Sequence, residues 1–155
     1  MSSPPVYIEL CIPAPAEGLS GALVAAWIEQ LLGRLPLDWV AATDVDVAGG
    51  VRSELLLSAQ EIRVARCAEF VAQLCRAEQV VWASLFFCSS PEAAAKIRPD
   101  ETYQSSTKKA LLAVRIVDAS YFYVIGAEST VRGLVPVLPQ GDLRVSSLEE
   151  LEFPE

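Results

Sequence analysis

The sequence predicts an α+β fold: a ferredoxin-like βαββαβ unit, in which an antiparallel sheet carries two helices on one face, followed by a C-terminal β-hairpin extension. Strand-like and helix-like hydrophobic periods alternate along residues 6–88. The strand–helix–strand order of residues 6–47 recurs in residues 51–88 as a weak internal repeat. A hydrophobic content of 52% and a mean hydropathy of +0.35 indicate a core large enough for such a unit.

A chain of 155 residues is expected to form one domain across residues 1–155. Within this domain we expect the βαββαβ unit at residues 6–88 and a polar loop at residues 98–109. A β-hairpin and an acidic tail are expected to occupy residues 110–155.

The first strand and helix have clear signals. Apolar and other residues alternate from residue 6 to residue 12, which predicts a strand with one strongly apolar face. Apolar residues then recur at helical spacing from residue 19 to residue 35. Gly33 and Pro36 are expected to end that helix.

A hairpin is expected to follow, with strands at residues 40–47 and 51–57. A three-residue loop, Ala48-Gly49-Gly50, would place Asp46 opposite Arg52 and leave one strand face mostly apolar. In this register Asp44 and Asp46 share the polar face.

A second helix is expected to begin at Ser58, because Ser58 and Glu61 have the spacing of a capping box. An apolar stripe then runs from Val64 to Cys75. Residues 80–88 are apolar on both faces, as in an interior strand.

The last third of the chain is less regular. It predicts a helical turn at residues 90–96 and a hairpin of residues 110–117 and 121–125 joined at residues 118–120. A further helical turn is expected at residues 128–134. The acidic tail is expected to be a short helix or a docked edge segment.

The residue types argue against catalysis. The chain contains no histidine, which excludes Ser-His-Asp and Cys-His arrangements and removes the commonest metal ligand. Its four cysteines lie within apolar patterns without the close spacing of zinc or redox sites. Gly49-Gly50 leads into an expected strand, not into a phosphate-binding helix. We therefore expect a protein that is not an enzyme and needs no cofactor or metal.

One motif leaves a metal-dependent alternative open. Asp44-Val45-Asp46 follows an apolar strand and resembles the Asp-x-Asp motif of glycosyltransferases over three residues. Two such carboxylates could share Mg²⁺ or Mn²⁺. The short chain leaves little room for a nucleotide-binding fold with an acceptor site, so this reading ranks below protein binding and below a hydrated strand face.

The charge of the chain favours a basic partner. The net charge is −8, and residues 1–50 hold six acidic residues against one basic residue. Such a chain should repel nucleic acid and anionic membranes and be steered toward basic surfaces. It has no apolar run of membrane-spanning length and no signal-peptide pattern at residues 1–10, which predicts a cytoplasmic protein.

In its small size, acidity and lack of catalytic motifs, the chain resembles the immunity proteins of bacterial polymorphic toxins. That resemblance implies an inhibitor that neutralises a cognate toxin domain, and it transfers no residue. The residues expected to contact the basic partner are acidic, with one loop tyrosine: Asp44, Asp46, Glu54, Asp100, Glu101, Tyr103, Glu149, Glu150 and Glu152. Tyr121 and Tyr123, on one strand face, would suit an interface or a half-buried core.

The alternative is a ferredoxin-like regulatory module that holds a small molecule at a sheet face or a dimer interface.

Overall fold

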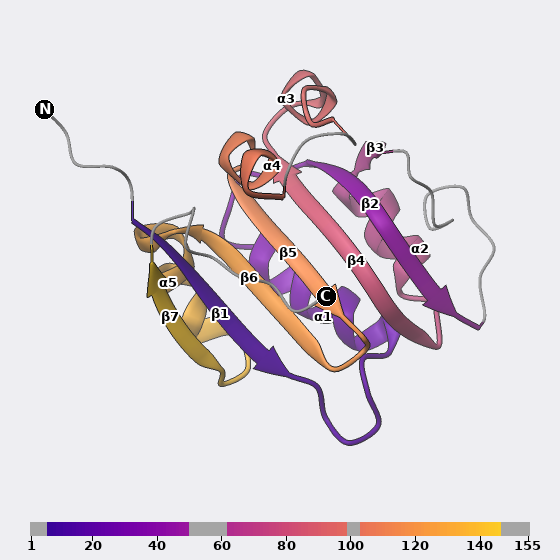
Figure 1. Cartoon of the computed structure of the whole chain (residues 1–155). Coiled ribbons are helices and arrows are strands. Elements are labelled where there is room, and N and C mark those ends of the chain that lie inside the picture. The colour runs from indigo at the N-terminus through magenta and orange to yellow at the C-terminus, as the bar shows by residue number, and fades with distance from the viewer. Residues whose placement is uncertain (1–5, 50–61, 99–102, 147–155) are drawn as a thin grey trace, which may run out of the picture.

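The computed structural model describes residues 6–49, 62–98 and 103–146. Its centre is a seven-stranded sheet in the order β3-β2-β4-β5-β6-β1-β7, in which every neighbouring pair is antiparallel (Figure 1). The strands are β1 (Tyr7–Pro13), β2 (Trp39–Ala48), β3 (Arg63–Arg66), β4 (Gln79–Cys88), β5 (Leu112–Val117), β6 (Tyr121–Ala127) and β7 (Asp142–Ser146).

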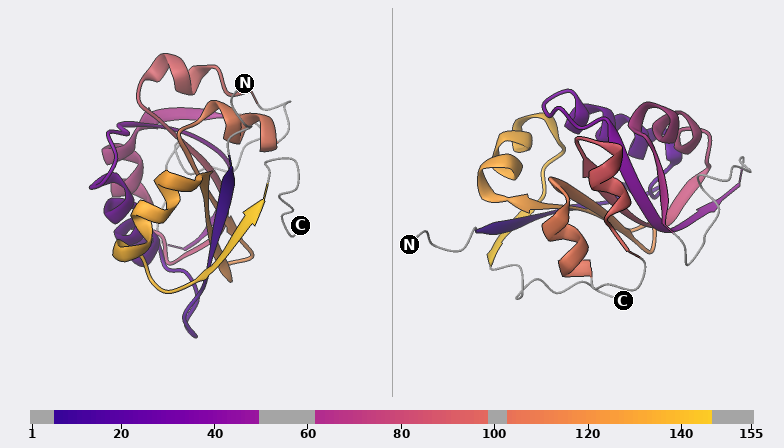
Figure 2. Two further views of the ribbon diagram at one scale, coloured as in Figure 1. Left: turned by 90° about the vertical axis from the view of Figure 1, so that its left-hand side faces the viewer. Right: turned by 90° about the horizontal axis from the view of Figure 1, so that it is seen from above.

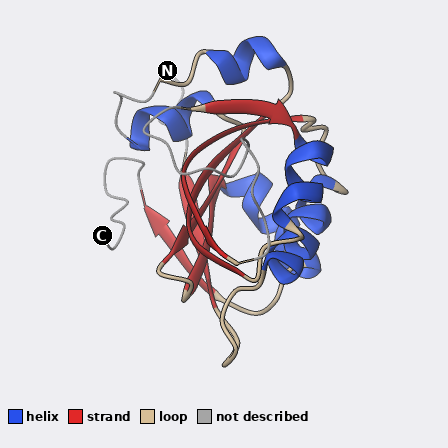
Figure 3. Cartoon of the chain, turned by 90° about the vertical axis from the view of Figure 1, so that its right-hand side faces the viewer, coloured by secondary structure: helices blue, strands red, loops and turns tan. Residues whose placement is uncertain are grey.

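Three helices cover one face of the sheet, which we call the helical face: α1 (Gly21–Leu32), α2 (Cys67–Leu74) and α5 (Glu128–Leu134). They lie behind the sheet in Figure 1 and together on one side of it in Figure 2. The opposite face, which we call the polar face, meets α3 (Pro91–Ala95) near one end. Helix α4 (Tyr103–Lys109) lies near the same end, so Figure 3 shows helices on both sides of the strands.

Alternation along the strands separates the two faces. Ile8, Leu10 and Ile12 of β1 join the large core beneath α1, α2 and α5, whereas Tyr7 and Cys11 pack on the polar face. The same division holds for β6, where Phe122 and Val124 face the helices and Tyr123 and Ile125 do not. Successive side chains of a strand therefore face different environments, one beneath the helices and the next on the polar face.

Local signals explain how α1 and α3 begin. The Ser20 hydroxyl accepts a hydrogen bond from the Leu23 amide at 3.1 Å, and Ser90 caps Ala93 in the same way at 3.1 Å. Pro91 stands at the start of α3, where its missing N–H costs nothing. Gly33 follows α1, as its sequence position predicted.

The ferredoxin-like prediction is wrong. The hairpin expected to extend the unit, β5–β6, lies in the middle of the sheet between β4 and β1. As a result β1 pairs with β6 and β7, and no βαββαβ unit closes within residues 6–88. Alternation identifies strands but carries no information about their order, so the repeat in the sequence predicted the wrong neighbours.

The second helix is shorter than predicted. Residues 63–66, expected to be helical, form β3 and pair with β2, with Trp39 opposite Arg66. The Arg66 guanidinium lies 4.8 Å from the centre of the Trp39 ring, which adds a cation–π contact to that pairing. Val64, expected on the apolar stripe, is exposed. The capping box at Ser58 and the expected strand 51–57 lie outside the described residues.

Two further elements differ from the prediction. The stretch 98–109, expected to be a polar loop, contains helix α4 from residue 103. Strand β7 follows the short 3₁₀ helix η1 (Val135–Val137) and pairs with β1, where no strand was expected. Among the described residues no helix has both the length and the apolar character needed to cross a membrane.

Candidate functional site

A row of polar and thiol-bearing residues crosses the polar face, one from each of six strands. The residues are direct neighbours in the strand pairing, so their side chains point to the same side. In order from β2 to β7, this polar row comprises Thr43, Ser84, Arg115, Tyr123, Cys11 and Asp142. The opposite side of these strands is the helical face, which packs against the helices.

At the β2 end of the row, a β-bulge exposes two carboxylates. The pairing of β2 with β4 is regular up to Thr43 and irregular from there to Val47, and Asp44 has a φ of 53°. Val45 is buried in the core, while its two neighbours in the sequence, Asp44 and Asp46, are exposed. The left-handed conformation is uncommon outside glycine, and aspartate is among the residues that adopt it most readily.

The two aspartates line a cavity of about 320 Å³ on the polar face. Trp82 is the strand partner of Asp46 and lies half-buried beside it. Ser84 and Arg115, which pair across β4 and β5, complete the polar lining together with the backbone around Ala83. The charged side chains of this lining are two aspartates and one arginine, a net charge of −1. The cavity can therefore receive a cationic group beside an aromatic ring.

The β1 end of the row has a different character. Glu9, next to Cys11 on the same strand face, is 6% exposed, and no described residue forms a hydrogen bond with its Oε2 atom. Burial raises the pKa of Glu9, and the attraction of Arg144 on β7 lowers it by less. Burial likewise raises the pKa of Cys11, against a hydrogen bond with Tyr123. Tyr123 pairs with Cys11 and stays protonated, because burial raises its pKa too.

The other buried thiols are also held in the neutral form. Burial, with Asp38 nearby, raises the pKa of Cys67 to about 12, and burial raises that of Cys88 to about 11. A neutral thiol is a poor nucleophile, so these cysteines act as apolar packing groups. Within the described residues, no three histidine, cysteine, aspartate or glutamate side chains stand close enough to hold a metal ion.

The structure places three of the predicted contact residues. Asp44 and Asp46 lie together at the cavity, and Tyr103 begins helix α4 on another part of the chain. The remaining predicted contacts lie outside the described residues: Glu54, Asp100, Glu101, Glu149, Glu150 and Glu152.

Three residues of the cavity were missed by the sequence analysis: Trp82, Ser84 and Arg115. A signal for Arg115 was present in the sequence, since Arg115 stands between the apolar residues Val114 and Ile116 of one expected strand. Trp82 and Ser84 lie in a stretch that was interpreted as apolar on both sides. Tyr121 and Tyr123 do share one strand face, with Tyr121 exposed, Tyr123 buried and their ring centres 6.1 Å apart.

Comparisons of the chain with known protein families, with curated protein sequences and with solved structures found no significant match.

Proposed function

We propose that this chain is a small, acidic, non-catalytic protein that binds and neutralises a basic protein partner. The observation that carries the proposal is the pair of exposed carboxylates, Asp44 and Asp46, at a cavity that also contains Trp82. Interface hot spots often combine a large aromatic side chain with charged neighbours in this way. A lysine or arginine of the partner would meet the carboxylates and lie against the indole ring.

The bulge supports a binding role for Asp44. A non-glycine residue in the left-handed region stores backbone strain, and bulges are frequent where a strand re-aims a side chain at a functional surface. Strict alternation from Ala42, which lies in the core beneath the helices, would place Asp44 and Asp46 on the helical face and Val45 on the polar face. Here both carboxylates reach one cavity while Val45 remains in the core.

The overall charge of −8 supports rapid capture of a basic surface. Long-range attraction raises the association rate more than it raises the affinity, and salt screens it. A fast-binding antidote suits a bacterial toxin, and we propose that the partner is a toxin domain neutralised in the cytoplasm, the role of an immunity protein.

The test uses the protein encoded beside this gene as the first candidate partner. Wild-type chain and the Asp44→Asn/Asp46→Asn double variant are compared for binding by surface plasmon resonance at several salt concentrations. The matched control, Glu17→Gln/Glu69→Gln, removes the same charge from exposed positions elsewhere. If the proposal holds, the first double variant loses about tenfold or more in affinity, equivalent to roughly 1.4 kcal/mol, and the control does not.

A growth assay separates neutralisation from binding alone. Cells that produce the partner should survive when they also produce the wild-type chain or the control, and should stop growing with Asp44→Asn/Asp46→Asn. A neighbouring protein that is harmless and does not bind the chain, or equal protection by all three forms, would contradict the proposal.

A further inference from the structure

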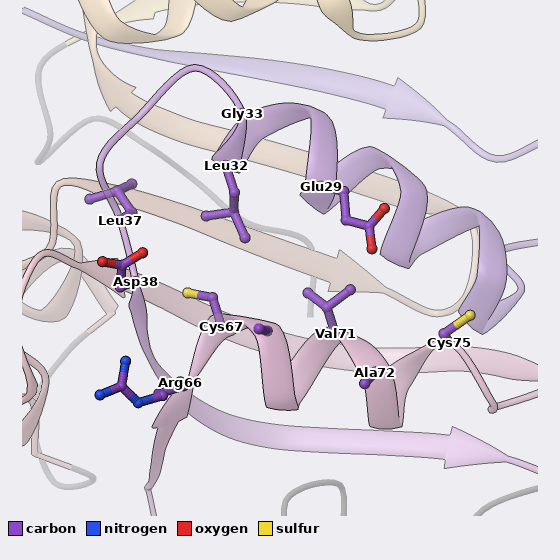
Figure 4. A pocket seen from close by; sticks show the side chains of 11 residues that line it. Glu29, Leu32, Gly33, Leu37, Asp38, Arg66, Cys67, Val71, Ala72 and Cys75 are labelled. Atoms are coloured by element: carbon purple, nitrogen blue, oxygen red, sulfur yellow. The ribbon is translucent and has the colours of Figure 1, made fainter.

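A second cavity lies on the other side of the sheet, between α1 and α2. Its volume is about 590 Å³, which lies within the range of small-molecule sites in proteins. Figure 4 shows its lining, which comes from the second half of α1, the segment that leads into β2, and α2. It shares no residue with the acidic cavity of the polar face.

The walls of this interhelical cavity are mostly apolar. Leu32 comes from α1, Leu37 from the connecting segment, and Val71 from α2 (Figure 4). The Cys67 thiol belongs to the same apolar wall, because burial keeps it protonated. The lining residue Ala72 of α2 is small and exposed, which leaves the space open.

The charged lining residues favour a cation. The Glu29 carboxylate points from α1 toward α2, and the Asp38 carboxylate lies beside Leu37 at the other end of the cavity (Figure 4). Arg66 contributes the one positive charge, and its guanidinium group is engaged over the Trp39 ring at 4.8 Å. Two carboxylates against one engaged guanidinium leave a net charge of −1 around an apolar space.

We propose that the interhelical cavity binds a small organic cation, an amine attached to an aliphatic or aromatic body. The body would contact Leu32, Val71 and Cys67, and the ammonium group would donate hydrogen bonds to Glu29 or Asp38. An anionic molecule of the same shape would meet two carboxylates. The cavity therefore favours ligands that have a positive charge as well as a suitable apolar area.

The exposed thiol of Cys75, which lines the cavity, provides a reporter. The probe is 4-phenylbutylamine, and the matched controls are 4-phenylbutanol and 4-phenylbutyrate. Alkylation of Cys75 by iodoacetamide is followed by mass spectrometry, and affinity by calorimetry. The amine should slow alkylation and bind about tenfold more tightly than the alcohol, as one charge-assisted hydrogen bond would give. The butyrate should bind most weakly.

Two kinds of variant locate the site. Glu29→Gln/Asp38→Asn should remove the preference for the amine over the alcohol while leaving alcohol binding unchanged. Ala72→Phe should fill the cavity and abolish binding of all three probes, whereas Ala26→Phe, at an exposed α1 position outside the lining, should not. Circular dichroism checks that each variant is folded.

Three results would overturn the proposal: equal binding of amine and alcohol to the wild-type chain, no protection of Cys75 by the amine, or unchanged binding in folded Ala72→Phe. None of them bears on the toxin partner, because the acidic cavity lies on the opposite face. Conversely, loss of partner binding in the Asp44 and Asp46 variants leaves this inference standing.

Discussion

The two faces of the sheet use the same strands for different purposes. On the helical face, nearly every inward residue is an aliphatic or phenylalanine side chain with no more than a few per cent exposure, as at Leu85, Phe87 and Val114. On the polar face, their immediate neighbours include Ser84 and Arg115, and the row continues through Tyr123 and Cys11. The strands thus alternate between the core beneath the helices and a face that carries both the polar row and a smaller buried cluster, which includes Phe86 and Ile125.

This difference indicates which face of the sheet supplies most of the stability and which face carries the proposed partner-binding site. Burial of apolar area beneath three helices accounts for the larger core. The polar face retains groups whose desolvation costs free energy, including the buried Glu9 carboxylate. Substitutions on the helical face should therefore change unfolding, and those at the acidic cavity should change binding.

The largest expected effect comes from truncating the helical-face core. Phe87→Ala removes a fully buried ring and should lower the free energy of unfolding by about 3–5 kcal/mol. Trp82→Ala, on the polar side of the same strand, removes a half-exposed ring and should cost about 1 kcal/mol or less while weakening partner binding. Urea titration measures both. Equal losses of stability would contradict the division between the faces.

A smaller loss is expected where α1 meets α2. A Cβ atom at Gly21 would overlap the carbonyl oxygens of Leu74 and Ala77, and the Gly21 amide donates to Ala77 at 3.0 Å. Gly21→Ala should therefore destabilise the chain by about 1–3 kcal/mol. Gly33→Ala is the matched control, because its Cβ would lie 3.4 Å from the nearest atom and its φ of −67° suits alanine. If both substitutions have the same effect, close packing at Gly21 is not the cause.

The buried carboxylate on the polar face should make stability depend on pH. Because burial raises the pKa of Glu9 above its ordinary value of 4.5, the folded chain holds this proton more tightly than the unfolded chain. The contribution of Glu9 to stability should thus fall as pH rises from about 4.5 through the raised pKa.

Glu9→Gln should remove that dependence and stabilise the chain at pH 7 by about 1 kcal/mol. Urea titrations of both forms between pH 4 and pH 8 provide the measurement. Lower stability of Glu9→Gln at pH 7 would mean that the attraction of Arg144 outweighs the burial of the carboxylate.

The smallest effect on folding is expected at the bulge. Glycine adopts the left-handed conformation of Asp44 without strain, so Asp44→Gly should change the free energy of unfolding by less than about 1 kcal/mol. Asp44→Ala, which removes the same carboxylate without relieving the strain, should be less stable than the glycine variant. Thermal unfolding ranks the two. Strong destabilisation by glycine would assign the aspartate side chain a structural role.

Local structure was predictable from the sequence to the extent that nearby residues determine it. The alternation at residues 6–12, the helix that ends near Gly33 and the turn around Asp118 all correspond to observed elements. Strand order was not predictable, because the pairing of Tyr7 with Ala127 depends on contacts between distant parts of the chain. Strand β3 was mistaken for a helix because only its pairing with β2 distinguishes it.

Only part of the candidate site could be predicted from the sequence, because its residues come from strands that are distant in the chain. Asp44 and Asp46 were identifiable as an exposed acidic pair, since both flank an apolar residue of one strand. Arg115 and Trp82 join them only through the order β2-β4-β5, which the repeat in the sequence misrepresented. A site assembled from several strands cannot be predicted from the sequence of any single strand.

The central position of the β5–β6 hairpin has a consequence for folding during synthesis. Strand β1 leaves the ribosome well before its partners β6 and β7, which are translated 108 to 139 residues later, from Pro13 with Tyr121 to Tyr7 with Ser146. At 5–20 residues per second, the two backbone edges of β1 wait roughly 5–28 seconds for their partner strands. The nascent chain therefore depends on shielding of that strand, by a chaperone or by transient non-native contacts, until the sheet can assemble.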